Sequence, residues 1–425
     1  MSTVEVVKSG GFSVVIDSIA SDKSISHRAA MFALLASGVS RIENFLRAED
    51  TLNTLNIVKN LGASIKDDGK IIEISSDGIK ESFEILDCGN SGTGMRLFCG
   101  LLSSANGHFV LTGDEYLRRR PMKRVTTPLI EMGAKIDGRS SGDLAPLSIR
   151  GSSLKAFNYT SSIASAQVKS ALILAALRAD GVCSYTEGEL TRDHTERMLK
   201  GMGAKIETRG LTTTIEPLKE PLKPLDLRVP ADPSSAFFFA VAAAITPNAR
   251  VVLEGLTLNP TRIEAFVVLQ KMGAKVELVQ RDDTYEPVGD VVVEYAPLRA
   301  VEVSENISWL IDEIPALSVA MACADGVSVI KNARELRVKE CDRIVAMVDG
   351  LRRCGIEVEE AEDGYSVKGG ELQSATIDSY ADHRIAMSFL VAGLRSGMVV
   401  DGVECINASF PNFLDLLSRL SEIKK

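Results

Sequence analysis

Basic residues stand at the predicted starts of seven helices along this 425-residue chain. A Lys or Arg lies in or beside the expected first turn of each of these segments: 23–28, 90–96, 118–124, 165–169, 191–196, 339–343 and 381–384. A cation in the first turn opposes the helix dipole by roughly 0.3–1 kcal/mol, so the repeated pattern indicates a compensating anion. Helix starts also offer free backbone N–H groups to phosphate and carboxylate, and Arg binds both groups in bidentate fashion. The pattern predicts a basic cleft for a ligand with several negative charges.

Acidic residues accompany two of the helix starts and could move protons. Asp312 and Glu313 precede an apolar helix expected over 316–324, and Glu340 lies beside Lys339. A carboxylate next to phosphate-binding cations stays ionised near neutral pH and can act as a base. Acids at a helix start can also simply favour the dipole, which leaves a structural role open for each of them.

Simpler structural explanations are open for several single residues of the basic segments. The helix-capping explanation applies to Ser24, Thr191 and Asp382. A role as solvated surface charge applies to Arg118 and Arg119. A structural role, without metal-ligand spacing, is expected for His27, His194 and His383.

Composition restricts the function classes. The chain has 48 Lys and Arg against 57 Asp and Glu, and a net charge of −9 argues against bulk nucleic-acid binding. Seven cysteines without a CxxC pair predict free thiols in a reducing cytosol, with neither a disulfide framework nor a metal site. The N-terminus does not resemble a signal peptide, and the apolar run 236–245 is too short to span a bilayer. A cytoplasmic protein without a membrane partner is expected.

A repeated tag divides the chain into similar lengths. An amphipathic helix ends in a Gly-containing tag and a polar strand follows, with glycines roughly 70 to 80 residues apart at 62, 133, 203, 273 and 355. Glycine just past a helix end is an ordinary stop signal in the left-handed conformation. Five tags at a near-constant period predict a duplicated unit of helices and strands. One-sided strands such as 69–75 favour mixed sheets with helices packed inside each domain.

The two ends of the chain appear as halves of one further unit. The last helix, about 411–420, is expected to lack a following strand, and 4–16 is expected to be a strand without a preceding helix. Joining them predicts a discontinuous domain of residues 1–20 plus 234–425 and an inserted domain of residues 21–233. Crossings are expected near 19–23 and 230–234, where Pro, Asp and Ser interrupt the pattern. A linear array of α/β repeats is the alternative.

Taken together, the motifs from Lys23 to Ser409-Phe-Pro411 resemble the 5-enolpyruvylshikimate-3-phosphate synthase (3-phosphoshikimate 1-carboxyvinyltransferase) family. The resemblance covers nearly the whole chain. It implies an enolpyruvyl transferase-like α/β fold: a two-domain inside-out α/β barrel, each domain three repeated βαβαββ-type units, with the active site in the cleft between the domains. It also implies a monomer that transfers the enolpyruvyl group of phosphoenolpyruvate to the 5-hydroxyl of shikimate 3-phosphate in chorismate and aromatic amino-acid biosynthesis, without a metal or organic cofactor.

Matching motif positions imply roles for individual residues. The shikimate 3-phosphate contacts implied are Lys23, Ser24, Arg28, Ser165, Ala166, Gln167, Arg192, Asp312 and Lys339. The phosphoenolpyruvate contacts implied are Lys23, Asn90, Gly92, Arg96, Arg120, Gln167, Arg343 and Arg384. Asp312 is the implied base for the hydroxyl, Glu340 the group that moves the proton at the methylene carbon, and Lys23 a catalytic cation near both substrates.

The sequence departs from the family pattern at one position and carries two opposed signals on inhibitor tolerance. Many members have Lys just before the late Phe-Pro, where this chain has Ala408-Ser409, so one phosphoenolpyruvate contact is missing. The segments 120–124, 165–169 and 192–196 look like the branch that is often tolerant of glyphosate. Gly92, however, is the small residue associated with access for that inhibitor.

Two other functions are compatible with parts of the pattern. The sister enolpyruvyl transferase acting on UDP-N-acetylglucosamine usually has a reactive Cys before the Arg-Pro that matches 120–121, and 113–119 contains none. A non-catalytic repeat protein that binds anionic metabolites would not require Asp312, Glu340 and all the basic helix starts together.

Overall fold

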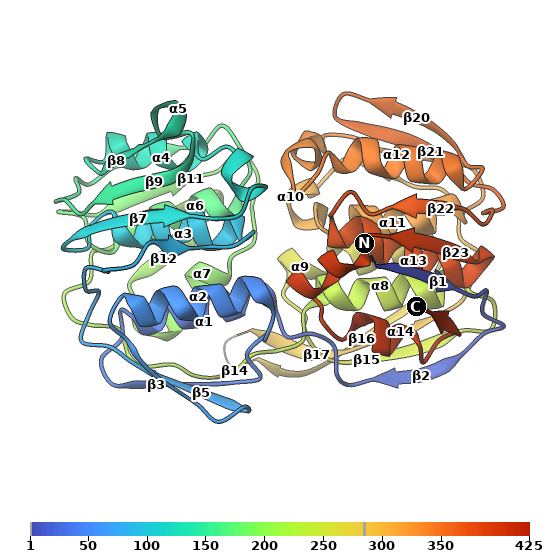
Figure 1. Ribbon diagram of the computed structural model, residues 1–425, viewed down its shortest axis with the longest axis horizontal. Helices are drawn as coiled ribbons and strands as arrows, with labels where there is room; N and C mark the ends of the chain where they lie inside the picture. The colour runs from blue at the N-terminus through green and yellow to red at the C-terminus, as the bar shows by residue number, and fades with distance from the viewer. Residues whose placement is uncertain (1, 284–285) are drawn as a thin grey trace. The chain divides into compact units, whose positions relative to one another are not determined.

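The computed structural model describes residues 2–283 and 286–425, which form two compact units. Unit 1 combines residues 1–20 with 230–425, and unit 2 is the continuous segment 21–229. The chain therefore passes twice from one unit to the other, and both termini lie in unit 1 (Figure 1). The second passage falls at residue 230, slightly before the expected domain start at 234.

Unit 2 contains three sheets and their connecting helices. The first repeat comprises α1 (Lys23–Ala33), β3 (Val39–Glu43), α2 (Glu49–Asn60), β4 (Ser64–Asp67), β5 (Ile71–Ser75) and β14 (Asp226–Arg228). The second comprises β6 (Leu86–Asp87), α3 (Gly92–Leu102), β7 (His108–Thr112), α4 (Lys123–Glu131), β8 (Lys135–Gly138) and β9 (Leu144–Arg150). The third comprises β10 (Asn158–Thr160), α6 (Ala166–Ala176), β11 (Cys183–Thr186), α7 (His194–Gly201), β12 (Ile206–Arg209) and β13 (Thr212–Ile215).

Unit 1 has the same construction. Its first repeat comprises β2 (Ser13–Ile16), α8 (Pro233–Ile245), β15 (Arg250–Thr257), α9 (Pro260–Lys271), β16 (Lys275–Asp283) and β17 (Pro287–Glu294). The second comprises β18 (Glu302–Val303), α11 (Ile314–Ala322), β19 (Val327–Ile330), α12 (Arg343–Arg353), β20 (Glu357–Ala361) and β21 (Gly364–Lys368). The third comprises β22 (Thr376–Asp378), α13 (His383–Ser396), β23 (Met398–Asp401), α14 (Phe413–Leu417), β24 (Ile423–Lys424) and β1 (Thr3–Val6).

All six four-stranded sheets share one connectivity. In the order β6-β7-β9-β8, for example, the first pair is parallel and the other two pairs are antiparallel. The same sequence of one parallel and two antiparallel pairs recurs in β18-β19-β21-β20. A parallel pair requires a crossover, and a helix provides it where the paired strands follow one another in the repeat, as α3 does between β6 and β7. The predicted fold of repeated βαβαββ units with mixed sheets is confirmed.

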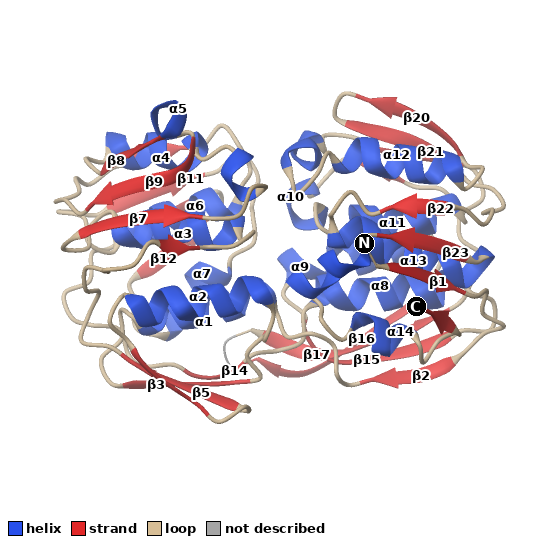
Figure 2. Cartoon of the chain, viewed as in Figure 1, coloured by secondary structure: helices blue, strands red, loops and turns tan. Residues whose placement is uncertain are grey.

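The crossover helices form the core of each unit. In unit 2, α3 packs against α6, and in unit 1, α11 and α13 pack against α8 and against each other. Every residue of α8 is buried, which explains why the run 236–245 is apolar on all sides of the helix. Figure 2 shows strands lying outside these helices within each unit, as β23 and β1 lie over α13. Among the described residues, no helix is both long and apolar enough to cross a membrane.

The tags end their helices as predicted. Each tag glycine has a φ between +78° and +104°, in the region that favours glycine. In α2, the N–H of Gly62 bonds to the carbonyl of Lys59 and the N–H of Ala63 to the carbonyl of Val58. The same two bonds recur at the other four tags. This pair of bonds is the Schellman motif, which satisfies carbonyls that a helix end leaves free.

Two expectations for the chain ends are wrong. Residues 4–16 do not form a single strand, because β1 and β2 belong to different sheets and a turn at Gly10-Gly11 separates them. At Gly11, φ is +114° and a side chain would meet the carbonyl oxygen of Pro247 at 2.9 Å. The last helix is also followed by a strand, since β24 pairs with β1. Two residues are too few for a periodic pattern, so this strand has no detectable signal in the sequence.

Candidate active site

In unit 2, the start of α1 presents the first group of predicted residues. Asp22 caps the helix by accepting the N–H of Ile25 at 2.8 Å, so Lys23 is the first helical residue. The interpretation of Ser24 as a cap is therefore wrong. Lys23 is half-buried, and its ammonium pairs with the buried carboxylate of Asp50 at the start of α2. That pairing holds the lysine at the N-terminal end of the inner helix.

Arg28, one turn further along α1, is almost fully buried. Its Nε donates to Thr195 Oγ1 at 2.7 Å, and its Nη2 donates to Ser170 Oγ at 2.8 Å. A third bond, 3.0 Å long, runs from Nη1 to the carbonyl of Ser24. Arg28 is thus bonded to α7, α6 and α1 at once, so the first and third repeats of unit 2 meet at its guanidinium.

The starts of α3 and α6 meet through a second arginine. Arg96 donates from Nη1 to Gln167 Oε1 at 2.5 Å and from Nη2 to the carbonyl of Pro121 at 3.1 Å. Gln167 in turn donates to Thr93 Oγ1 at 2.9 Å. The amide of Gln167 is therefore fixed from both ends, with its oxygen on the arginine and its nitrogen on the hydroxyl.

Arg120 completes this cluster beside Gly92. Its Nη1 lies 3.4 Å from the carbonyl oxygen of Asn90, which it contacts as a weak donor. A Cβ atom at Gly92 would lie 2.9 Å from the guanidinium of Arg120, so only glycine leaves this space to the arginine. Because α4 begins at Lys123, Pro121 lies just before the helix. The expectation for Arg119 fits the structure, since that side chain is exposed and pairs with Glu115 at 3.4 Å.

The remaining predicted residues of unit 2 lie at the starts of α6 and α7. Ser165 is the N-cap position of α6, and Ala166 is the first helical residue. Arg192 is half-buried and lies just before α7. Thr191 is not a helix cap, because its hydroxyl donates to Glu187 at 2.7 Å and the cap position belongs to Asp193.

In unit 1, Arg343 is the centre of the predicted group. This buried side chain contacts three carboxylates: Asp382 at 2.8 Å, Glu340 at 2.7 Å and Asp312 at 3.4 Å. Burial lowers the pKa of Arg343, but the charges of Asp382, Glu340 and Asp312 outweigh burial and raise it above its ordinary value. Arg343 is therefore a permanent cation that contacts both potential proton-transfer groups, Asp312 and Glu340.

Arg384 and Lys339 lie in the same unit. Asp382 caps α13, as the capping interpretation required, by accepting the N–H of Arg384 at 2.7 Å. The Arg384 guanidinium donates to the carbonyl of Ser234 at 3.2 Å and lies 5.7 Å from the ring centre of Phe238. Burial lowers the pKa of the Lys339 ammonium below its ordinary value, although nearby carboxylates, Asp312 first among them, act in the opposite direction. The Lys339 ammonium therefore loses its charge at a lower pH than an ordinary lysine.

The predicted residues therefore form two clusters. The unit 2 cluster consists of Lys23, Ser24, Arg28, Asn90, Gly92, Arg96, Arg120, Ser165, Ala166, Gln167 and Arg192. The unit 1 cluster consists of Asp312, Lys339, Glu340, Arg343 and Arg384. Both clusters lie at N-terminal ends of helices, where backbone N–H groups add to the positive charge.

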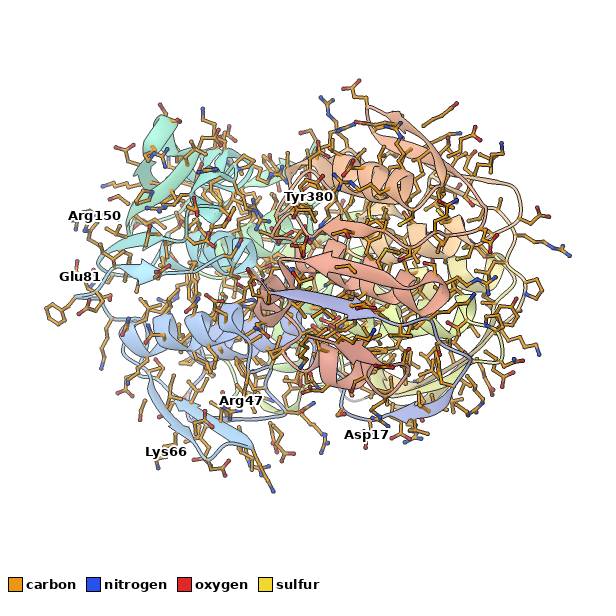
Figure 3. The ribbon with its side chains drawn as sticks, turned by 45° about the vertical axis from the view of Figure 1, so that its right-hand side comes forward. Asp17, Arg47, Lys66, Glu81, Arg150 and Tyr380 are labelled. Carbon is orange, nitrogen blue, oxygen red and sulfur yellow. The ribbon has the colours of Figure 1, made fainter. Side chains whose placement is uncertain are left out.

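Other basic residues of unit 2 do not belong to its cluster. Arg150 and Lys66 are exposed and point away from the protein in Figure 3. Arg47 is also exposed and forms a two-pronged ion pair with Asp67, with contacts of 2.8 and 2.5 Å. Charge alone thus does not define the site, and the arrangement at the helix starts does.

Several residues of the clusters were not identified from sequence. Ser170 and Thr195 bind Arg28, and Asp50 binds Lys23. A serine inside the apolar run of α6 was a detectable signal for the first, because a buried hydroxyl needs a partner. His27 is buried, and burial lowers its pKa well below the ordinary value. A neutral ring between Thr54 and Ser91, at 2.7 and 3.3 Å, agrees with the structural role expected for it.

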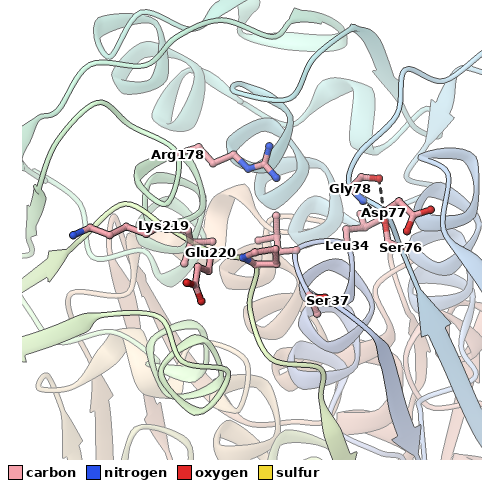
Figure 4. Close-up of a pocket in the computed structure, with 12 residues that line it drawn as sticks. Leu34, Ser37, Ser76, Asp77, Gly78, Arg178, Lys219 and Glu220 are labelled. Atoms are coloured by element: carbon pink, nitrogen blue, oxygen red, sulfur yellow. Dashed lines mark hydrogen bonds between the residues drawn. The ribbon is translucent and has the colours of Figure 1, made fainter.

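No metal-binding group of His, Cys, Asp or Glu occurs in the described ranges 2–283 and 286–425. All seven cysteines are free. A cavity of about 510 Å³ lies in unit 2 at the C-terminal end of α1, lined by Leu34, Ser37, Arg178 and others (Figure 4). It contains none of the predicted site residues, which lie at the N-terminal end of the same helix.

Six βαβαββ repeats around buried crossover helices define the fold class of the enolpyruvyl transferases. The enolpyruvyl transferase NikO from Streptomyces tendae has this fold, with a TM-score of 0.78 at 17% identity over 99% of this chain and 98% of that one. The chain belongs to the EPSP synthase family, because the model of EPSP synthase (3-phosphoshikimate 1-carboxyvinyltransferase) matches residues 13–417.

Named relatives agree with this family. A 3-phosphoshikimate 1-carboxyvinyltransferase of Sulfurimonas denitrificans is 70% identical, covering 100% of this chain and 99% of the relative. Another, from Nitratiruptor sp., is 63% identical, with 100% of both covered. The structure of EPSP synthase from Acinetobacter baumannii matches with a TM-score of 0.87 at 39% identity, with 100% of both chains covered.

Proposed function

We propose that the chain transfers the enolpyruvyl group of phosphoenolpyruvate to the 5-hydroxyl of shikimate 3-phosphate, releasing phosphate. The observation that carries the proposal is the 70% identity, over the full chain, to a protein of that name. The two clusters suit such substrates, because both carry phosphate and carboxylate groups that arginines and helix starts bind. This reaction is a step in the biosynthesis of chorismate and the aromatic amino acids.

The proposed reaction needs a proton-transfer group for two steps, and Asp312 and Glu340 beside Arg343 can serve them. The substrate hydroxyl attacks C2 of phosphoenolpyruvate and gives its proton to Asp312, while Glu340 gives a proton to the methylene carbon. The tetrahedral intermediate then loses phosphate, and a proton leaves the new methyl group to restore the double bond. Arg343 keeps Glu340 and Asp312 within 2.7 and 3.4 Å of its guanidinium, which suits two groups acting on one substrate pair.

The substrate contacts divide as the motifs imply. We assign shikimate 3-phosphate to Lys23, Ser24, Arg28, Ser165, Ala166, Gln167, Arg192, Asp312 and Lys339. We assign phosphoenolpyruvate to Lys23, Asn90, Gly92, Arg96, Arg120, Gln167, Arg343 and Arg384. Because these residues come from both units, we propose that the two clusters act together in a cleft that closes on the substrates and excludes water.

The motifs also support a finer assignment within the family. Segments 120–124, 165–169 and 192–196 suggest the branch often tolerant of glyphosate, whereas Gly92 suggests access for that inhibitor. Ser409 is buried where many members have a Lys nearby, so one cation is missing from the phosphoenolpyruvate side. We propose that the chain belongs to the glyphosate-tolerant-type branch, and inhibition by glyphosate at several phosphoenolpyruvate concentrations measures its degree of tolerance. Free cysteines throughout suit a cytoplasmic enzyme, and we propose a monomer, to be checked by sedimentation.

One assay tests the proposed function. The protein is incubated with shikimate 3-phosphate and phosphoenolpyruvate, and released phosphate is measured. Release that requires both substrates is the expected result. No release with this pair, together with release when UDP-N-acetylglucosamine replaces shikimate 3-phosphate, would assign the protein to the sister reaction. Binding without release in either assay would favour a non-catalytic anion-binding protein.

A further inference from the structure

A group of three buried charges lies behind the unit 2 cluster. Lys169, in the first turns of α6, places its Nζ 2.8 Å from Glu187 Oε1 and 2.8 Å from Glu196 Oε1. Glu187 follows β11, and Glu196 lies in the first turn of α7. All three side chains are buried, with residue exposures of 1%, 2% and 7% in the order Lys169, Glu187, Glu196. We call these three residues the buried triad.

Stability alone does not account for the buried triad. Burial lowers the pKa of Lys169, but the two carboxylates outweigh burial and raise it, so the lysine stays charged. Burial raises the pKa of Glu196, which reflects the free-energy cost of keeping this carboxylate away from water. Apolar residues of similar volume often replace buried ion pairs without loss of stability. The three charges are therefore expected to have a positional role, which is defined by the groups to which they bond.

The buried triad is hydrogen-bonded to the loop that carries Arg192. Lys169 Nζ donates to the carbonyl oxygen of Thr191 at 3.1 Å. The hydroxyl of Thr191 donates to Glu187 Oε2 at 2.7 Å. The residue immediately before Arg192 is thus tied to the buried triad through both its backbone and its side chain. These two bonds fix the direction in which the chain presents Arg192.

The buried triad also adjoins the residues that hold Arg28. Ser170 follows Lys169 on α6, and Thr195 precedes Glu196 on α7. The two hydroxyls lie 2.7 Å apart, and each accepts a hydrogen bond from the Arg28 guanidinium. A shift of α7 against α6 would move both acceptors. The ion pair between Lys169 and Glu196 is the charged contact that sets this spacing.

We infer that the buried triad of Lys169, Glu187 and Glu196 positions Arg192 and Arg28 to bind shikimate 3-phosphate. The inference rests on the proposed function for the identity of the ligand. The triad members are positioning residues, since they act through the two arginines. Their loss should weaken uniform binding of one substrate, which raises its KM and leaves kcat nearly unchanged.

The test compares Lys169→Met with Lys205→Met. The first removes the buried charge at similar volume, and the second removes an exposed lysine of unit 2 that pairs with Glu216 at 3.4 Å. For Lys169→Met, we expect KM for shikimate 3-phosphate to rise about 10-fold or more, with KM for phosphoenolpyruvate and kcat within about 3-fold. We expect the Lys205→Met variant to match the wild type. Equal rises in both KM values would overturn the inference, because a general structural defect predicts them.

A double-mutant cycle tests the route through Arg192. If Lys169 acts through that arginine, Lys169→Met should raise KM much less in an Arg192→Ala background than in the wild type. Full additivity would contradict the inference.

Thr191→Val, which keeps the three charges and removes only the bond to Glu187, covers the case in which Lys169→Met does not fold. An unchanged KM for shikimate 3-phosphate in Thr191→Val would then overturn the inference. A wild type without phosphate release would instead overturn the proposed function, and calorimetric binding of shikimate 3-phosphate would still test the positioning role.

Discussion

At the scale of single residues, the unit 1 cluster is organised by the charge of Arg343. Its guanidinium lies between Asp382, which caps a helix, and Glu340 and Asp312, which have no such structural duty. Arg343 stays protonated, so each of these carboxylates lies beside a permanent positive charge. Asp312 and Glu340 are the two groups assigned to proton transfer, and their functions can be separated by substitutions that keep size and remove charge.

Asp312→Asn should reduce turnover far more than binding. The amide preserves the shape of the side chain but cannot accept the hydroxyl proton, so kcat should fall by roughly 10²–10⁴-fold. KM for shikimate 3-phosphate should change by less than about 5-fold, since that binding depends mainly on cations. Steady-state phosphate release measures both. Asp325→Asn, an exposed acid beyond the other end of α11, is the control. Near-normal turnover in Asp312→Asn would show that this residue is not the base.

Lys339 should give the enzyme an alkaline limit. Its pKa lies below that of an ordinary lysine because of burial, so its charge is present at low pH and is lost as pH rises through the lowered pKa. KM for shikimate 3-phosphate should therefore rise on the alkaline side. Lys339→Arg should move this rise to higher pH, because arginine keeps its proton. Lys331→Arg, at an exposed lysine paired with Glu302, should leave the profile unchanged. Identical profiles for all three proteins would contradict this assignment.

At the scale of elements, the repeated helix ends and helix starts serve different purposes. The Schellman glycines stop the outer helix of each of five repeats, so that a hairpin strand can follow. The helix starts carry the cations and the acids. The free energy of unfolding is therefore expected to depend on the glycine-tagged C-terminal helix ends, and substrate binding on the N-terminal helix starts.

Gly203→Ala should lower the free energy of unfolding without affecting catalysis. Gly203 has a φ of +97°, and a Cβ atom there would meet nothing closer than 3.9 Å, so the cost is conformational. Roughly 1–2 kcal/mol is expected for an L residue in this region. Urea unfolding measures the loss. Gly188→Ala, where a Cβ meets nothing within 4 Å and φ is not positive, is the control. An equal effect in both variants would rule out the conformational explanation.

At the scale of the whole molecule, each unit has a complete set of three sheets and its own core. Unit 2 contains every strand of its sheets within the continuous segment 21–229. Unit 1 depends on strands from both ends of the chain, because β1 and β2 are N-terminal. Unit 2 can therefore be produced as one continuous fragment, whereas unit 1 needs segments from both ends of the chain, although the repeats of the two units are alike.

The fragment 21–229 should fold by itself and lack activity. Every strand of its three sheets lies within the fragment, and its last strand, β14, is parallel to β3 at an edge. The fragment should unfold cooperatively in urea and release no phosphate, since Asp312 and Glu340 are absent. A shorter fragment, 21–220, loses β14 and the buried Leu222, Leu225 and Leu227, and should be much less stable. Non-cooperative unfolding of 21–229 would show that unit 2 needs unit 1 to fold.

The sequence by itself determined the repeats, the helix starts and the family. Tag glycines act on the backbone of a few neighbouring residues, so they can be recognised wherever they occur. The sequence also predicted that the N-terminal segment joins the C-terminal half, as the strand pairing of β1 with β23 has it. It did not separate β1 from β2, because a pattern of apolar residues does not indicate which sheet a strand joins.

Only the tertiary structure decided which charged groups meet. Arg28 binds Thr195 across 167 residues of sequence, and Arg96 binds Gln167 across 71. Such partners are selected by how helices pack, which local propensity and periodicity do not encode. The same holds for the buried triad: the sequence places Lys169 among the cations of the helix starts and does not indicate that Glu187 and Glu196 bind it. The three become ion-paired because the packing of α6 and α7 brings their charges together away from water.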